Sequence, residues 1–388
     1  MSQEPDVFSG WQNYPRNLQI SALDADTDQC NTRLKEDATR LFVPSEDECE
    51  LRMQSFPRQI GPCRDLELTE VATSEALAER LKEFKQENSV WIFEIAQLYS
   101  WGQFLITEEL FRKLVTALKV HSRFLDVVHT FGERAAPVEE SYAAFFSKLY
   151  REPSPSLSCS YEITYNVKYV ARHGRASQHD PFSIRQTGVY HKFQASSEPN
   201  IWLLLHPPEN LSRRFAQACT HPQASEPVAQ ARYHALVFHC LSDNWREYVN
   251  YLEETFTTSM DRGCFSNLSE PSEVGEGMND VSFGDIRQLQ IMTDKLEKLK
   301  HLLELNSSTC ERLQTLFDRI AFGSATGTDQ SVREGDDNIK NCIFELDRHA
   351  SRLKTLLKRA GGIKSMVIFH VHSFERTQLK YIIRSSTY

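Results

Sequence analysis

Short apolar runs and strict alternation mark several strands in the middle of the chain. Residues 90–96 form an aromatic and β-branched run that is typical of a buried strand. Residues 161–170 carry an apolar side chain at every second position, which predicts a strand with one apolar face. Further strands are predicted at 183–193 and 201–205, each bounded by turn-forming residues. Together these runs indicate a β-sheet.

Helical spacing appears between and after these strands. Thr107 is a predicted N-cap, and the apolar residues that follow it share one face of a helix. A longer helix is predicted over 226–255, where apolar residues recur every three or four positions. The mixture of strands and helices favours an α/β body.

The region after residue 283 repeats apolar residues in alternating steps of three and four, which is the pattern of a coiled-coil seam. A loop at 323–337 interrupts the pattern, and a second helix is predicted to end at Gly361-Gly362. The two helices most simply fold back as an antiparallel hairpin, with Asn306 as the polar residue that fixes the register. The predicted seam is Leu289, Met292, Leu296, Leu299, Leu303, Asn306, Leu313, Phe317 and Ile320.

These patterns predict an α+β fold, in which a mixed α/β body precedes a long antiparallel helical hairpin or coiled coil. No transmembrane helix is expected in this chain, because spanning a bilayer takes about 20 mostly apolar residues and the apolar runs are far shorter. The predicted regions are a polar and partly disordered N-terminal region (1–88), the α/β domain (89–265), an acidic linker (266–282), the coiled-coil hairpin (283–363) and a basic tail (364–388).

Charge is unevenly distributed. The formal net charge of −9 argues against a general nucleic-acid-binding protein, which usually carries a clustered positive excess. From Ala350 onward, however, eight Lys or Arg face a single acidic residue, Glu375. This basic end is expected to be a solvated helix face and tail, with peripheral contact to an anionic membrane as the alternative.

Cysteine usage and the first residues indicate a compartment. The nine cysteines are scattered and form no C-x-x-C pair, which argues against a disulfide framework or a zinc module. The chain starts with no basic and apolar leader. A cytoplasmic location is therefore expected, with membrane association only through a partner.

The order of these elements resembles the cytosolic part of CorA-type divalent-cation transporters, and more closely the fungal CorA-like transporter-domain proteins. The resemblance runs from about Trp91 to Ile363, and Phe182 stands where the family usually has tryptophan. The residues that carry it include Trp101, Gly132, Pro181, Ile184, Arg185, Gly188, Tyr190 and Trp202.

The resemblance implies two membrane helices after the hairpin, the first of which ends in Gly-Met-Asn. Here Gly277-Met278-Asn279 precedes the hairpin and follows acidic and polar residues that could not span a bilayer. We interpret the tripeptide as a coincidence. The ion path of the family lies in the part that this chain lacks, so the resemblance implies no transport by the chain alone.

Two clusters suggest metal chemistry. His173, His179, Asp180 and His191 flank a turn between two predicted strands and offer ligands suited to zinc or manganese, although a polar hairpin loop explains them more simply. In the second cluster, Asp336 and Asp337 offer oxygen ligands for weak Mg²⁺ binding, whereas stabilisation of a helix start is the simpler role. No resident cofactor is expected beyond such weak Mg²⁺ binding.

Four functions are open at this point. The leading hypothesis is a non-enzymatic cytosolic protein that acts by protein association or regulation of a membrane partner. A second is a divalent-cation transporter whose membrane helices are missing from this chain, and a third is a scaffold that self-associates through the coiled-coil seam. The fourth is a metal-dependent hydrolase that uses His173–His191.

Overall fold

The chain folds into two compact units in the computed structural model. Unit 1 comprises Met1–Asp243 with Asn306–Ile343, and unit 2 comprises Asn244–Leu305 with Phe344–Tyr388. The residues that the structure describes are 7–18, 24–57, 68–83, 89–136, 138–151, 159–175, 180–194, 199–219, 227–264, 283–322 and 330–385. The whole predicted acidic linker (266–282), which contains the tripeptide Gly277-Met278-Asn279, and His179 lie outside these residues.

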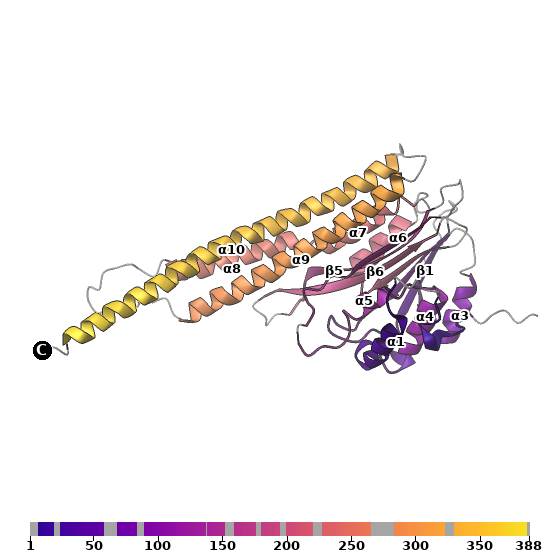
Figure 1. Cartoon of the computed structure of the whole chain (residues 1–388), viewed down its shortest axis with the longest axis horizontal. Coiled ribbons are helices and arrows are strands. Elements are labelled where there is room, and N and C mark those ends of the chain that lie inside the picture. Colours follow the sequence, from indigo (N-terminus) through magenta and orange to yellow (C-terminus); the bar gives the residue numbers. More distant parts are fainter. Residues whose placement is uncertain are drawn as a thin grey trace, which may run out of the picture. The chain divides into compact units, whose positions relative to one another are not determined.

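Unit 1 is built on a seven-stranded sheet in the order β2-β1-β3-β7-β6-β5-β4 (Figure 1). The pair β3–β7 is parallel and the other pairs are antiparallel. The strands are β1 (Leu51–Pro57), β2 (Thr69–Val71), β3 (Ser89–Ile95), β4 (Phe145–Arg151), β5 (Cys159–Arg172), β6 (Phe182–Phe193) and β7 (Asn200–Leu205). This sheet confirms the strands predicted from apolar runs and alternation.

Helices of the N-terminal half pack on one face of the sheet. Helix α4 (Glu108–Ala117) starts as predicted, since the Thr107 hydroxyl accepts a hydrogen bond from the Leu110 amide at 3.2 Å. Its apolar face is buried in the main core together with Phe93 of β3. The other elements of this half are η1 (Trp11–Asn13), α1 (Thr27–Glu36), α2 (Ala38–Leu41), η2 (Glu46–Glu48), α3 (Ser74–Glu83) and α5 (Phe124–Val128).

The opposite face of the sheet is covered by α6 (Glu209–Cys219), α7 (Ala231–Ser242) and the second half of α9 (Phe283–Phe322). Trp202 of β7 stands edge-on to Phe215 of α6, with ring centroids 4.7 Å apart. Phe317 of α9 meets Tyr161 of β5 in the same way at 5.9 Å. Unit 1 therefore buries both faces of its sheet, which explains why β5 is buried at ten consecutive positions.

The described part of residues 1–88 differs from the polar, partly disordered region predicted from composition. It supplies two strands of the sheet, and Tyr14, Leu34 and Leu51 are fully buried in the core. Arg112 of α4 fastens this region by donating hydrogen bonds to the Tyr14 carbonyl at 2.8 Å and to the Asn31 side chain at 3.0 Å. The apolar anchors are single residues spaced by polar ones, a pattern that composition alone does not reveal.

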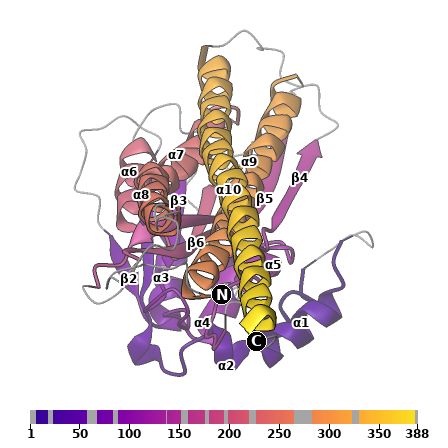
Figure 2. The same cartoon turned by 90° about the vertical axis from the view of Figure 1, so that its left-hand side faces the viewer.

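Long helices form the C-terminal part of the chain, as predicted. Helix α8 (Trp245–Cys264) follows α7 after a turn, so the predicted helix 226–255 is two helices. Helices α9 and α10 (Gln330–Ser385) run antiparallel, since Gln314 bonds Asp336 at 3.0 Å near their connection and Gln290 bonds Lys364 at 2.6 Å far from it (Figure 2).

Helix α10 continues through Gly361-Gly362, where the sequence predicted a helix end. Neither glycine has a positive φ, and a Cβ on either would meet no atom within 4 Å. Each costs about 1 kcal/mol relative to alanine inside a helix, a cost that good helix formers on both sides offset.

No helix within the described residues has a stretch that is both long and apolar enough to cross a membrane.

Candidate functional site

The structure places His173 and Asp180 together at the end of the β5–β6 hairpin. The Nε2 atom of His173 lies 2.6 Å from the Asp180 carbonyl, and Nδ1 of His173 accepts a hydrogen bond from the Arg175 amide at 3.0 Å. Asp180 in turn accepts one from the Phe182 amide at 2.9 Å. These bonds hold together the described residues at the ends of the two strands.

His191 lies far from that turn. Phe182 pairs with Arg172 next to the turn, and His191 is nine positions further along β6. A strand rises about 3.3 Å per residue, so His191 is roughly 30 Å away. His191 therefore does not converge with His173 and Asp180, and no group of three His, Cys, Asp or Glu in the described ranges could hold a metal ion.

His191 instead belongs to a buried chain of hydrogen bonds, which we call the histidine relay. The relay consists of Tyr165, His234, His191, Asn200 and Gln230, all at most 4% exposed. The distances along it are 2.9 Å from the Tyr165 hydroxyl to His234 Nδ1, 3.0 Å from His234 Nε2 to His191 Nδ1, 2.9 Å from His191 Nε2 to Asn200 Oδ1, and 3.0 Å from Asn200 Nδ2 to Gln230 Oε1.

The relay has a single consistent direction of donation. Because the carbonyl oxygen of Asn200 only accepts, His191 must donate through Nε2 and accept through Nδ1. His234 then donates through Nε2 and accepts the Tyr165 hydroxyl at Nδ1. Both imidazoles are neutral in this arrangement. Burial agrees, since it lowers the pKa of His191 to about 3 and that of His234 well below its ordinary value.

The β5–β6 hairpin extends beyond its neighbours on both sides. Strand β4 pairs with β5 only as far as Tyr165, and β7 pairs with β6 only from Gly188 onward. Asn306 of α9 covers part of the exposed β5 edge, because its side chain donates to the Lys168 carbonyl at 2.7 Å and accepts from the Lys168 amide at 3.4 Å. The predicted register residue is thus a cap on a strand edge.

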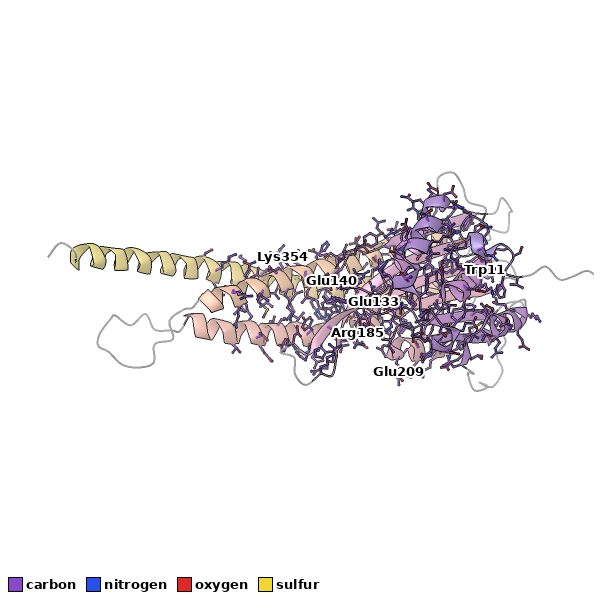
Figure 3. All side chains as sticks on the ribbon, turned by 90° about the horizontal axis from the view of Figure 1, so that it is seen from below. Trp11, Glu133, Glu140, Arg185, Glu209 and Lys354 are labelled. Carbon is purple, nitrogen blue, oxygen red and sulfur yellow. The ribbon has the colours of Figure 1, made fainter. Side chains whose placement is uncertain are left out.

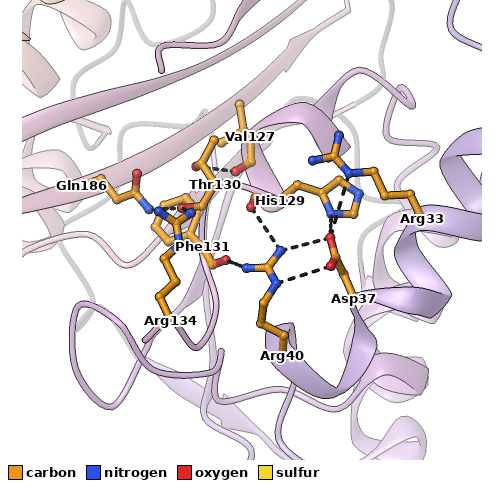
Figure 4. A network of polar contacts seen from close by, with 9 residues as sticks. All are labelled: Arg33, Asp37, Arg40, Val127, His129, Thr130, Phe131, Arg134 and Gln186. Carbon is orange, nitrogen blue, oxygen red and sulfur yellow. Dashed lines mark hydrogen bonds and ion pairs between the residues drawn. The ribbon is translucent and has the colours of Figure 1, made fainter. Parts of the chain in front are cut away.

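A network of polar contacts holds the Phe131-Gly132 turn beside this extension (Figure 4). Arg40 donates to the Phe131 carbonyl and, at 3.3 Å, to the His129 carbonyl, while its guanidinium also bonds Asp37 at 3.0 Å. The Asp37 carboxylate accepts from His129 Nδ1 at 2.7 Å. Burial acts to raise the pKa of Asp37, but Arg40 and His129 outweigh it and the pKa lies below its ordinary value.

Gly132 is required by this turn. Its φ is +95°, and a Cβ would stand 2.7 Å from the backbone oxygen of Arg40. On the other side of the turn, the Thr130 carbonyl accepts from Arg134 and, at 2.5 Å, from the Gln186 side chain of β6. The turn is therefore fixed between α2 and the protruding hairpin.

A small hollow opens between this turn and the hairpin, and we call it the basic crevice. Its volume is about 30 Å³, and it brings together segments from four parts of unit 1. Figure 3 labels Glu140 and Arg185, two of the residues that line it. The complete lining is Ser100, Trp101, Arg134, Glu140, Lys168, Ile184, Arg185 and Gln186.

Three cations and one carboxylate line the basic crevice. The Lys168 ammonium donates to the carbonyls of Glu139 and Glu140 at 2.7 and 2.6 Å, and Arg134 donates to the Val138 carbonyl at 2.6 Å. Burial, with the nearby Arg134 charge, lowers the pKa of Lys168 to about 7. Neutral carbonyls solvate these charges without neutralising them, so the crevice keeps an excess of positive charge.

A second cavity, of about 700 Å³, lies over the opposite end of the hairpin. Its floor includes Lys148, Glu162 and Lys192, which are directly opposite one another on β4, β5 and β6. Lys148 bonds Asp24 at 2.9 Å, and the Glu162 carboxylate accepts from the Tyr150 and Tyr190 hydroxyls at 3.2 and 2.9 Å. The charges in this row therefore alternate in sign and have opposite charges beside them within the protein.

The coiled-coil seam residues are buried inside the chain. Leu296, Leu299 and Leu303 are at most 1% exposed in unit 2, whereas Phe317 packs against Tyr161 of the sheet in unit 1. Leu313 and Ile320 are buried as well, and Leu289 and Met292 are partly buried.

Asp336 lies within the second turn of α10, because the helix begins at Gln330 and not next to the aspartates. Its carboxylate accepts hydrogen bonds from Gln314 and Lys340. Both oxygens of Asp336 are thus engaged, and Asp337 follows it on the helix.

The residues of the basic crevice were only partly visible in the sequence. Trp101, Ile184 and Arg185 stand among the positions that carry the family resemblance, whereas Lys168 and Arg134 do not. Polar side chains alternate with apolar ones in residues 161–170, and Lys168 is the last polar residue of this series. Its position there is the sequence signal that could have pointed to the crevice. The other family positions are structural: a Cβ at Gly188 would meet Val127 at 2.7 Å, and Trp202 stacks on His191 at 3.7 Å.

Comparisons with known proteins give one family. A family model described as CorA-like transporters matches residues 6–263, which are 258 of the 388 residues and include the whole sheet. The match begins within the N-terminal region, well before Trp91, where the resemblance described above starts. No curated protein matches the chain in sequence.

Several solved structures are similar at low identity. The full-length CmaX protein is 11% identical, with 86% of this chain and 82% of that chain covered and a TM-score of 0.45. The soluble domain of CorA from Methanocaldococcus jannaschii is 10% identical, with 81% and 95% covered and a TM-score of 0.41. The ZntB cytoplasmic domain from Vibrio parahaemolyticus is 9% identical, with 82% and 99% covered and a TM-score of 0.35.

Proposed function

The chain belongs to the family of CorA-like transporters, and from this premise we propose that it is a non-catalytic regulator of divalent-cation transport that acts by association with another protein. The family match over residues 6–263 carries the proposal, since it includes every strand of the α/β body. A cytoplasmic location, with the membrane reached only through the partner, belongs to the same proposal.

The chemistry of the described residues supports a non-catalytic role. The histidine relay satisfies each of its side chains with a neighbour, and its imidazoles are held neutral by burial. His191 lies apart from His173 and Asp180 along β6, which weighs against a hydrolase that would use these residues together. Polar groups so engaged position the fold instead of reacting with a substrate.

Two separate exposed apolar side chains on the long helices give the association candidate contact points. Ile291 of α9 and Phe344 of α10, both in unit 2, are 58% and 67% exposed. Large apolar side chains are enriched at protein interfaces. The buried seam favours these contact points over self-association through Leu299 and Leu303, because those leucines are covered within the chain.

Cation uptake in cells tests the proposal. Deleting the gene should change the rate of Mg²⁺ or Zn²⁺ uptake, and the full chain should restore it. Phe344→Asp should fail to restore uptake although the protein folds, whereas Lys354→Ala, an exposed change on the same helix, should restore it fully. Unchanged uptake after deletion would contradict the proposal.

The transporter alternative predicts a different result. Purified chain reconstituted alone into lipid vesicles should carry no cation if the protein is a regulator. A cation flux through such vesicles that depends on the chain would overturn the regulatory proposal in favour of direct transport.

A further inference from the structure

The guanidinium of Arg185 forms no hydrogen bond or ion pair with any other described residue. Its Nε atom is buried and has no acceptor. An arginine side chain carries five N–H donors, and a buried donor without a partner is unfavourable, which indicates a place for an acceptor. Arg185 lines the basic crevice.

We propose that the basic crevice binds a small oxyanion such as phosphate or sulfate, with Arg185 as its principal ligand. The site goes beyond the regulatory role proposed above and does not depend on it.

The electrostatics of the crevice favour an anion. Arg134, Lys168 and Arg185 face one lining carboxylate, Glu140, and Glu139 acts on Arg134 and Lys168 as a second, so the local charge is positive while Lys168 is protonated. Arg134 and Lys168 donate to backbone carbonyls, which leave their charges unneutralised. An oxyanion in the crevice would supply the negative charge that this group of side chains lacks.

The size of the basic crevice suits two oxygen atoms of a tetrahedral anion. A volume of about 30 Å³ holds about two water-sized atoms. A guanidinium offers two parallel N–H donors that match two oxygens of a phosphate or sulfate. Trp101 and Ile184 add apolar surface to the lining, although Trp101 is 37% exposed and the crevice stays open to solvent.

Anion binding at this site should be coupled to protonation of Lys168. The charged groups around Lys168 are Arg134, Glu139, Glu140 and Arg185, and with the crevice empty the pKa of Lys168 is about 7. A bound anion raises this pKa, because the opposite charge favours the ammonium form. Sulfate binding above pH 7 should therefore take up a proton, and its affinity should fall roughly tenfold between pH 6 and pH 8.

Isothermal titration of the full-length protein with sodium sulfate tests the proposal, against sodium chloride at equal ionic strength. We expect saturable binding, weakened roughly ten- to hundredfold in Arg185→Gln, since a charge-assisted hydrogen bond is lost. Arg213→Gln, which removes an exposed arginine from α6, should bind like the unaltered protein. Absence of saturable binding, or equal binding by Arg185→Gln, would overturn the site.

Lys168→Met separates the proton linkage from simple charge. This variant should bind sulfate more weakly but with an affinity that no longer changes between pH 6 and pH 8. A pH dependence that persists in the variant would overturn the role of Lys168. Titration with inorganic phosphate and with adenosine triphosphate identifies the source: tighter binding of the nucleotide indicates the phosphate group of a larger ligand, and equal or weaker binding indicates the free anion.

Discussion

The two ends of the β5–β6 hairpin carry polar groups under opposite conditions. At one end, β4 and β7 flank the hairpin and the histidine relay is fully buried. At the other end, neither neighbour continues, and the basic crevice forms along the free edge of β6. The relay satisfies its hydrogen bonds internally, whereas the crevice keeps an unbonded guanidinium and an excess of positive charge.

This difference teaches how sheet topology decides the fate of polar residues. A strand flanked on both sides and covered on both faces excludes water, so polar side chains there must bond to one another. A strand edge leaves room for a ligand or solvent to complete the bonding. The relay should therefore matter for stability, and the crevice for binding.

The largest effect should come from breaking the relay. His234→Phe leaves the Tyr165 hydroxyl and His191 Nδ1 without partners in a dry core. Each unsatisfied group costs about 1–3 kcal/mol, so the free energy of unfolding should fall by about 3–5 kcal/mol in urea denaturation. His239→Ala on the same helix should change it by less than about 0.5 kcal/mol. A small loss for His234→Phe would remove the stabilising role of the relay.

The next effect in size should be a fall in the free energy of unfolding at acid pH. The unfolded chain protonates its histidines below an ordinary pKa of about 6.5, whereas folded His191 resists protonation down to its pKa of about 3. The unfolded state then binds more protons, so the free energy of unfolding falls as the pH drops through this window. The slope should be about 1.4 kcal/mol per pH unit for His191. Urea denaturation between pH 6.5 and pH 4.5 measures how the free energy of unfolding changes with pH. In His191→Asn this slope should be smaller by about 1.4 kcal/mol per pH unit.

The turn that borders the crevice should be sensitive at Gly132. Gly132→Ala forces a side chain into a left-handed backbone conformation and against the Arg40 carbonyl, so a loss of about 2–3 kcal/mol is expected in thermal or urea unfolding. Gly174→Ala provides the matched control, because φ is +69° there but no atom lies within 4 Å of the added Cβ. That control should lose about 1 kcal/mol. Equal losses of stability in the two variants would mean that the contact with the Arg40 carbonyl contributes nothing.

The role of Asn306 can be tested by whether its replacement raises or lowers the stability of the protein. In a coiled-coil seam, replacing a buried asparagine by leucine usually raises stability. At the β5 edge, Asn306→Leu would leave the amide and carbonyl of Lys168 without partners, and the loss should be about 1–2 kcal/mol. A stabilised Asn306→Leu protein in urea unfolding would restore the coiled-coil interpretation.

Local patterns of the sequence predicted β3, β5, β6, β7 and α4, because periodicity is set by neighbouring residues. The relay could not be predicted, since His191 and His234 are 43 residues apart and meet only when β6 lies against α7. The basic crevice was equally hidden, because its lining comes from four separate segments. The sequence marks Asn306 as a polar residue in an apolar seam, but its partner is 138 residues away on β5, which a local pattern cannot reveal.

The smallest effect should be seen at Arg185 itself. In buffer without oxyanions, Arg185→Gln removes a positive charge that has no acceptor among the described residues and lies in an already positive crevice. Nothing bonded is lost and a like-charge repulsion is relieved, so the free energy of unfolding should stay within about 0.5 kcal/mol of the original value. Adding sulfate should then raise the melting temperature of the unaltered protein and leave that of the variant unchanged, because a ligand stabilises only the state that binds it. A marked loss of stability without sulfate would instead make Arg185 a structural residue, like those of the relay, and would erase the contrast between the two ends of the hairpin.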